Sequence, residues 1–203
     1  MLELKDVSVV FNEGTVNEKV ALNNINLALD KGDFVTIIGS NGAGKSTLFQ
    51  AISGAVDTKR GNIILNGRDI TFEPEYKRSK GIGRLFQDPL KGTAPNMTIE
   101  ENLHLSNQRG KHFSLSLMSH RHREEFKKAL MELELGLEER LDSKVGLLSG
   151  GQRQALTLLM ATLVTPDLLL LDEHTAALDP KTALKVLELS LIHISEPTRP
   201  LYI

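Results

Sequence analysis

A glycine-rich loop between an apolar run and a helical pattern constrains this chain more than any other feature. Residues 34–38 (Phe-Val-Thr-Ile-Ile) predict a short central strand of a parallel sheet, and they run into the loop at residues 39–47 (Gly-Ser-Asn-Gly-Ala-Gly-Lys-Ser-Thr). A helix should start near Lys45 and end at about Ser53, with Gly54 as its stop. A buried strand, a glycine loop and a helix in this order predict an α/β fold.

The loop has the chemistry of a phosphate-binding site. Its spacing, Gly-x-x-x-x-Gly-Lys-Ser, is the Walker A pattern, in which glycines let backbone amides and the positive helix end approach phosphate oxygens. Lys45 supplies a point charge for the β- and γ-phosphates, and the Ser46 hydroxyl can bind magnesium. A plain glycine turn with an incidental lysine is the alternative, which the flanking patterns disfavour. The nucleotide-binding residues predicted here are Gly39, Ser40, Asn41, Gly42, Ala43, Gly44, Lys45 and Ser46.

A second buried strand ends in a carboxylate. Four leucines at residues 168–171 are too apolar for a surface strand and predict a parallel strand covered on both faces. Asp172 follows them, and a carboxylate at the mouth of a buried strand is costly unless a cation or hydrogen bonds meet it. Magnesium, through bound water, is the partner we expect. An acidic strand end that faces solvent is the alternative.

Residues 148–154 (Leu-Ser-Gly-Gly-Gln-Arg-Gln) open another helix, which Ser149 should cap and which Pro166 should end. We expect its buried face to consist of Ala155, Leu156, Leu159 and Leu163. Free amides at the glycines and the serine hydroxyl would make an anion site. That site has no ligand within one chain, because Lys45 already serves the first loop. An ordinary helix cap with flexible glycines is the alternative.

Together these three segments resemble the ATP-binding-cassette (ABC) ATPases, and the resemblance covers residues 1 to about 190. It implies an α/β P-loop NTPase fold with a RecA-like core, an antiparallel β sub-domain at about 1–30 and 60–85, and a helical insert at about 90–150. It also implies ATP and Mg²⁺ as cofactors. In this family each ATP lies between the phosphate loop of one subunit and the Ser-Gly-Gly segment of another, so the partner would be a second copy or a paired ABC ATPase.

The resemblance also implies individual roles. Glu173 corresponds to the general base that polarises the attacking water, and Thr47 to a contact of the α-phosphate. Gln87, in Leu-Phe-Gln-Asp-Pro, corresponds to the glutamine that binds magnesium and couples the nucleotide to the helical insert. Phe11 lies where the family places an aromatic that stacks on adenine, although it can equally belong to the core.

The implied site is therefore the following. The catalytic residues are Glu173, Lys45 and Gln87, and the metal residues are Ser46, Gln87 and Asp172. The second-subunit residues are Ser149, Gly150, Gly151 and Gln152, and residues 177–179 (Ala-Leu-Asp) match the D-loop that runs along the same interface.

Other segments predict local structure without chemistry. Apolar residues alternate at Leu2, Leu4, Val7 and Val9 with a phase slip, and again over residues 20–29, which predicts two bent, half-buried strands. Residues 62–66 predict a strand that ends in an Asn-Gly turn. Thr98 and Glu101 form a capping-box pattern. A helix over residues 120–135 would place Phe126, Leu130, Leu133 and Leu137 on one stripe, and a last helix would cover residues 181–190.

The chain departs from the family pattern near its C-terminal end. His174 stands where proline is usual, either as a pH-sensitive group or as a feature of a subfamily. The family's switch histidine follows one further core strand, which we expect to be missing, and His193 lies too close to Glu173 to replace it. Residues 191–203 resemble translated adapter sequence and are expected to be a foreign tail, with a genuine disordered end as the alternative. Because the missing strand would leave an apolar edge beside residues 34–38, we expect weak ATPase activity.

Composition narrows the partners. A length of 203 residues fits one domain of ordinary size or one domain with a sub-domain. The absence of cysteine excludes disulfides, and the net charge of −2 suggests no nucleic-acid partner. The chain shows no secretion signal, and no apolar run is long enough to cross a membrane. The pair His120 and His122 is expected to be solvated surface rather than a metal site. The basic run over residues 109–128 is likewise expected to be a solvated face, close to a membrane partner.

Within the family, residues 39–44, 92–102 and 172–180 resemble the ATPase subunits of bacterial amino-acid-type importers, with the tryptophan/tyrosine systems as the nearest group. This implies a peripheral subunit at the cytoplasmic face of the inner membrane that binds a permease and serves a solute-binding protein indirectly. A soluble ABC ATPase acting on ribosomes or DNA is one alternative, and an inactive truncated fragment is another.

Overall fold

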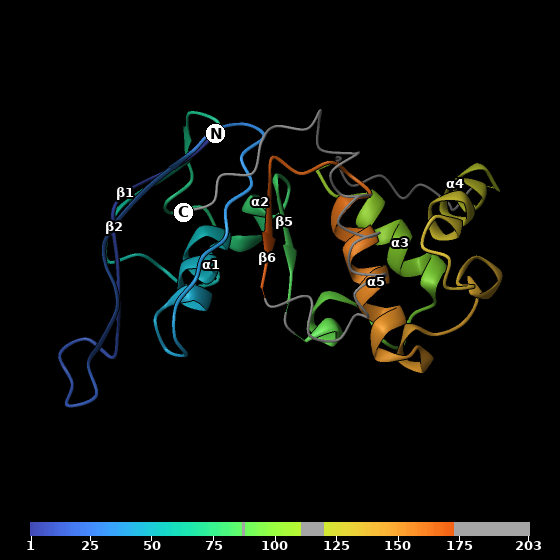
Figure 1. The fold of residues 1–203 in the computed structure, drawn as a ribbon, viewed down its shortest axis with the longest axis horizontal. Coiled ribbons are helices and arrows are strands. Elements are labelled where there is room, and N and C mark those ends of the chain that lie inside the picture. The colour runs from blue at the N-terminus through green and yellow to red at the C-terminus, as the bar shows by residue number, and fades with distance from the viewer. Residues whose placement is uncertain (87, 111–119, 173–203) are drawn as a thin grey trace. The chain divides into compact units, whose positions relative to one another are not determined.

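The computed structural model describes residues 1–86, 88–110 and 120–172 (Figure 1). The chain forms two compact units, and the described parts of these units are residues 1–82 and residues 83–172. Gln87, Glu173 and the expected segments at residues 177–179, 181–190 and 191–203 lie outside the described residues, as do His174 and His193.

The first unit is built on an antiparallel sheet of four strands. These are β1 (Leu2–Phe11), β2 (Lys19–Leu29), β3 (Arg60–Leu65) and β4 (Arg68–Asp69), in the order β2-β1-β3-β4. The predicted phase slip in β1 is an irregularity between Leu4 and Val7, where Asp6 adopts a positive φ of 51°. Because this bulge shifts the alternation by one residue, both halves of the strand turn their apolar side chains to the core. Asn66 and Gly67 both have positive φ, as a tight hairpin turn requires.

Helix α1 (Lys45–Ser53) has the predicted bounds, and it contacts β2. It ends at Gly54, whose φ of 81° lets its N–H bond back to the last turn of the helix. The short helix α2 (Glu75–Arg78) carries Arg78, which is 4% exposed and donates to the carbonyls of Ala51 (2.7 Å) and Ile52 (3.0 Å). These carbonyls belong to the C-terminal turn of α1, so the arginine fixes that end of the helix.

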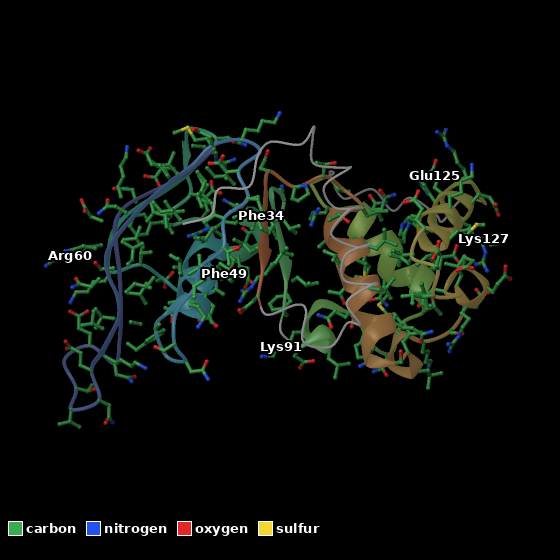
Figure 2. The ribbon with its side chains drawn as sticks, viewed as in Figure 1. Phe34, Phe49, Arg60, Lys91, Glu125 and Lys127 are labelled. Carbon is green, nitrogen blue, oxygen red and sulfur yellow. The ribbon has the colours of Figure 1, made fainter. Side chains whose placement is uncertain are left out.

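The prediction of a central strand at residues 34–38 is wrong for this structure. No strand hydrogen bonding is found there within residues 1–82, and Phe34 and Ile38 are 48% and 84% exposed. Figure 2 labels Phe34 in this segment. Among the described residues, no strand of the sheet β2-β1-β3-β4 pairs with the segment. An apolar run forms a strand only where partners receive its backbone groups, and apolarity alone does not provide them.

The second unit combines a two-stranded sheet with helices. Its strands are β5 (Ile82–Leu85) and β6 (Leu168–Leu171), and its α-helices are α3 (Ile99–Asn107), α4 (His120–Met131) and α5 (Gly150–Thr162). Three short 3-10 helices, η1 (Pro89–Gly92), η2 (Glu138–Arg140) and η3 (Val145–Leu147), connect them. The three α-helices contact one another (Figure 1), and each contributes buried side chains to the core cluster of this unit.

The helical elements largely follow the prediction. Thr98 and Glu101 form the expected capping box at the start of α3, and the predicted apolar stripe of α4 is buried. However, α4 ends at Met131 rather than at residue 135, because Glu134 and Gly136 take positive φ and turn the chain. The stripe residues beyond the helix still reach the core from the turn that follows. Helix α5 ends at Thr162, before Pro166, as expected.

Strand β6 has the predicted bounds, but its expected coverage on both faces is incomplete. Of its four leucines only Leu170 is buried, at 5% exposure, and the others are intermediate. Its hydrogen-bonded neighbour in the described sheet is β5 alone. A strand with a neighbour on one side only does not reach the burial typical of a central parallel strand.

The basic run over residues 109–128 is less solvated than expected. Arg109 donates to the carbonyl of Ala161 (2.8 Å) and to that of Val164, and its burial lowers its pKa. Arg123 pairs with Glu100 and Asp142. Charged side chains of α4 that do face outward include Glu125 and Lys127 (Figure 2).

Of the pair His120 and His122, the second does not lie on the solvated surface that was expected. The His122 ring is half-buried, lies 5.9 Å from that of His104 and stacks on Phe126. Long or amphipathic side chains bury their apolar parts along a helix face, which a simple count of basic residues does not reveal.

Candidate nucleotide site

The loop at residues 39–44 leads into α1 with its amides free of side-chain caps. Gly42 and Gly44 have φ values of 83° and 93°, and no side-chain hydrogen bond caps the helix at Gly44. Left-handed glycines turn successive N–H groups toward the same side, which forms a concave anion site at the positive end of the helix. The two left-handed glycines are compatible with the Walker A pattern, and phosphate binding at this loop stays a prediction.

Lys45 lies over this loop. Its ammonium group donates to the carbonyls of Gly39 (2.7 Å) and Ser40 (3.1 Å), so the side chain bends back toward the start of the motif. Ser46 is exposed and Thr47 half-buried in the same first turn. The positive charge and two hydroxyls thus gather at the end of the helix where phosphate oxygens would bind.

Close packing sets the position of the loop on the sheet. A Cβ atom added to Gly44 would lie 2.7 Å from the carbonyl oxygen of Ala21 and 3.2 Å from Leu22 Cδ2, both on β2. Only glycine permits this approach together with its positive φ. The loop is therefore held against β2, whose pairing with β1 ends at Phe11 and Lys19. Phe11 is half-buried, so the described contacts leave both of its predicted roles open.

The start of α5 is organised differently. Ser149 Oγ accepts from the amide of Gln152 (3.2 Å), and Gln152 Oε1 accepts from the amide of Ser149 (3.2 Å). This reciprocal capping box confirms Ser149 as the cap and engages one of the amides that we expected to be free. Gly150 and Gly151 have no hydrogen-bond partner for their amides in the described part of the chain. Those two amides and the serine hydroxyl remain for an anion.

Asp172 follows β6 and is tied to β5. Its amide donates to the carbonyl of Leu85 (3.4 Å), two residues before Gln87 in the chain. Its half-buried carboxylate and the Ser46 hydroxyl are oxygen donors, the ligand type that Mg²⁺ prefers. Within the described ranges, no group of three His, Cys, Asp or Glu side chains could hold a metal by itself. Ser46 belongs to the first unit and Asp172 to the second.

Two arginines near these helices have contacts that the sequence analysis did not foresee. Arg78 fixes the C-terminal turn of α1, and Arg153 of α5 donates to three carbonyls of the segment before Ser149. Arg153 stands in the quoted motif, one helical turn after the cap, and this spacing is the signal that could have suggested a contact there.

Comparison with known proteins decides the family. Residues 22–176 match the model of the ABC transporter family. The chain belongs to this family. It is therefore an ABC ATPase with the P-loop NTPase fold that the sequence resemblance implied, and ATP is its nucleotide. Among the residues described, no helix is long and apolar enough to cross a membrane.

Several relatives of this ABC ATPase are similar over most of their length. A tyrosine transport ATP-binding protein of Clostridioides difficile (strain R20291) is 45% identical over 190 residues, which are 94% of this chain and 76% of the relative. The xylose/arabinose import ATP-binding protein XylG of Sulfolobus acidocaldarius is 37% identical over 191 residues, covering 94% and 72%. A solved dimeric structure of the ATP-binding cassette MJ0796, in a post-hydrolysis state bound to ADP and Pi, matches with a TM-score of 0.79. It is 30% identical and is covered to 81%, and the match takes in 93% of this chain.

Proposed function

We propose that this chain is the ATPase subunit of an amino-acid-type importer, which closes as a dimer on two ATP molecules and drives a membrane permease. The observation that carries the proposal is the presence of two different helix starts suited to anions. The start of α1 has glycine amides and Lys45, and the start of α5 has two free glycine amides and a serine hydroxyl without a lysine. An ATP molecule held between two subunits uses both kinds of end at once.

The proposed catalytic roles follow from the chemistry of phosphoryl transfer, in which positioned charge contributes most of the rate enhancement. Lys45 neutralises the β- and γ-phosphates. Ser46 and Asp172, together with Gln87, hold Mg²⁺ directly or through water. Glu173 acts as the general base toward the attacking water. Ser149, with the amides of Gly150 and Gly151, contacts the phosphate bound by the partner subunit.

The remaining nucleotide contacts are secondary in this proposal. Thr47 contacts the α-phosphate, and Phe11 stacks on adenine at the end of β1. Gln152 serves the site through the capping box that orients Ser149. The subunit lies at the cytoplasmic face of the cell membrane, held there by the permease, and it serves a solute-binding protein indirectly.

The proposed cargo is an aromatic amino acid such as tyrosine. Support comes from the relative named for tyrosine transport, whose identity of 45% exceeds the 37% of the relative named for xylose and arabinose. The cargo passes through the permease, so the residues of the ATPase carry little direct information about it. An ATPase that works away from membranes is the second candidate function.

The dimer is tested with Glu173→Gln, which removes the base but keeps the shape of the side chain. Sedimentation with ATP and magnesium should show a stable dimer of the variant, because ATP binds and is not hydrolysed. Glu124→Gln, an exposed change on α4, is the matched control and should remain in the parent's monomer–dimer distribution. A Glu173→Gln protein that stays monomeric at saturating ATP would contradict both the role of Glu173 and the ATP-closed dimer.

The transport role is tested separately with a candidate amino-acid permease and its solute-binding protein. Membrane vesicles that contain the permease, the binding protein and this subunit should take up radiolabelled tyrosine only with ATP, and Lys45→Ala should abolish the uptake. Excess unlabelled tyrosine should compete, and xylose should not. Uptake of a different solute would refute the cargo alone, whereas failure of the subunit to bind these membranes would favour the soluble ATPase.

A further inference from the structure

The side chain of Arg153 holds the backbone that leads into Ser149. From α5 it reaches back along the chain and donates to Val145 O (3.3 Å), Gly146 O (3.1 Å) and Leu148 O (2.8 Å). The Arg153 amide also donates to Ser149 O (2.9 Å) as part of the helix. One residue thus donates to four of the five carbonyls from Val145 to Ser149.

The N–H groups of this segment are fixed by other bonds. The amide of Val145 donates to Met97 O (3.0 Å), and that of Gly146 donates to Pro95 O (2.8 Å). The segment is therefore held both through the N–H groups of Val145 and Gly146 and through its carbonyls. Leu148 and Ser149 are both extended, with ψ values of 151° and 161°, so they connect η3 to α5 without a turn of their own. The position of the serine then depends on both sets of bonds.

We propose that Arg153 is a positioning residue for the closed ATP dimer. It sets the Ser149 hydroxyl and the two glycine amides in the geometry that receives the partner's phosphate, and it does so without contacting the nucleotide. This inference rests on the proposed function, because it requires ATP at the start of α5. A displacement of about 1 Å at such a site is enough to lower the rate by two orders of magnitude.

The geometry requires arginine rather than a positive charge alone. A guanidinium group presents five N–H donors in a planar fork, and here Nε and Nη2 reach different carbonyls at the same time. A lysine ammonium is one atom on a flexible stem, so it cannot span the same carbonyls in a fixed arrangement. Arg153→Lys therefore distinguishes a positioning role from an effect of charge, because the variant keeps the positive charge and loses the planar set of donors.

The experiment compares Arg153→Lys and Arg153→Gln, each in the Glu173→Gln chain so that ATP is not consumed. Binding of a fluorescent ATP analogue to the monomer reports the phosphate loop, and sedimentation against ATP concentration reports dimer closure. Arg121→Lys and Arg121→Gln are matched controls on α4, where the guanidinium is exposed and pairs with Glu125 only one turn away. Urea unfolding of each variant shows whether the unit remains folded.

We expect both Arg153 variants to keep the monomer affinity within about twofold and to need about tenfold more ATP for half-maximal dimer. The Arg121 variants should match the parent in both measurements. A lysine variant that closes like the parent while the glutamine variant does not would overturn positioning in favour of charge. Equal losses of monomer affinity, closure and unfolding midpoint in the lysine variant would overturn it in favour of a merely structural role.

Ser149→Ala separates this inference from the function on which it rests. If Ser149→Ala impairs closure and Arg153→Lys does not, the role of Arg153 is refuted and the proposed dimer stands. If Ser149→Ala closes as readily as the parent, the start of α5 does not receive ATP. The proposed function and the inference would then both fail.

Discussion

The two helices that begin at glycine-containing motifs, α1 and α5, start in opposite ways. The cap of α1 is Gly44, in a left-handed conformation without a side-chain hydrogen bond, and Lys45 bends over the loop. The cap of α5 is Ser149, extended and closed by its reciprocal bonds with Gln152. The first end is kept open by glycine geometry and so is ready for a strongly charged ligand. At the second end, Ser149 and Gln152 already satisfy some of each other's hydrogen-bonding groups. This suits a contact that is made only when another molecule brings the phosphate.

Their other ends are alike. Arg78 donates to the last carbonyls of α1, and Arg109 donates to Ala161 and Val164 at the end of α5. A cation at the C-terminal end of a helix satisfies free carbonyls and interacts favourably with the helix dipole. Each helix is thus anchored at the end away from its proposed ligand, and the functional difference between them resides in the first turn.

The largest expected effect of breaking this comparison is at Lys45. Lys45→Ala removes the charge of the α1 end and should lower ATP turnover by about a thousandfold, with weaker binding to the monomer. Steady-state hydrolysis and titration with a fluorescent ATP analogue measure both quantities. Lys31→Ala, an exposed lysine before the loop, is the control. Near-normal monomer affinity in Lys45→Ala would show that glycine amides alone hold the nucleotide.

Arg78→Met should have the next largest effect, chiefly on stability. The arginine donates to Ala51, Ile52, Thr71 and Glu73 carbonyls, and its burial lowers its pKa. Methionine has a similar volume but leaves those acceptors without a donor, which should lower the free energy of unfolding by about 3 kcal/mol. Urea denaturation measures this loss. Arg68→Met is a matched control, because Arg68 is exposed and pairs with Glu73 at the surface. Equal destabilisation by both changes would show that the Arg78 bonds contribute nothing specific.

Local patterns were sufficient to predict much of this structure. The bounds of α1, its stop at Gly54, the capping box of α3, the serine cap of α5 and the strand at Leu168–Leu171 each depend on residues close together in the chain. The glycine spacing of residues 39–44 also agrees with the local backbone, because positive φ at Gly42 and Gly44 is a conformation that glycine favours. The apolar stripe of α4 was predicted even though the helix itself ends early.

What could not be predicted depends on partners far away in sequence. Residues 34–38 have the composition of a buried strand, but a strand also needs hydrogen-bonded neighbours. The residues of the segment do not determine whether such neighbours are present. Arg78 lies 27 residues from Ala51, so its capping of α1 has no local signature. Arg109 lies 52 residues from Ala161, and it was therefore interpreted as part of a solvated basic run.

Gly44→Ala sharpens the comparison at the backbone. The new methyl would lie 2.7 Å from Ala21 O at a φ of 93°, so both a clash and a strained conformation should lower the free energy of unfolding by about 2 kcal/mol. Nucleotide affinity should fall with it, because the loop must move away from β2. Gly42→Ala is the control, since it has a similar φ of 83° but no atom within 4 Å of the added methyl. Gly42→Ala should show the backbone strain without the clash. Equal losses of unfolding free energy in the two variants would mean that the contact with β2 does not contribute to the effect of Gly44→Ala.

Gly150→Ala should have the smallest effect on stability and the opposite sign. Nothing lies within 4 Å of the added methyl, and the φ of Gly150 is not positive. Alanine in place of glycine inside a helix raises the free energy of unfolding by about 0.5–1 kcal/mol, so the variant should unfold at slightly higher urea. Its ATP-driven dimer formation should nevertheless weaken, because the methyl occupies the surface that we propose for the partner's phosphate. If Gly150→Ala is more stable and closes like the parent, then α5 begins with glycine for a reason other than ATP. The two helix starts would then not form halves of one site.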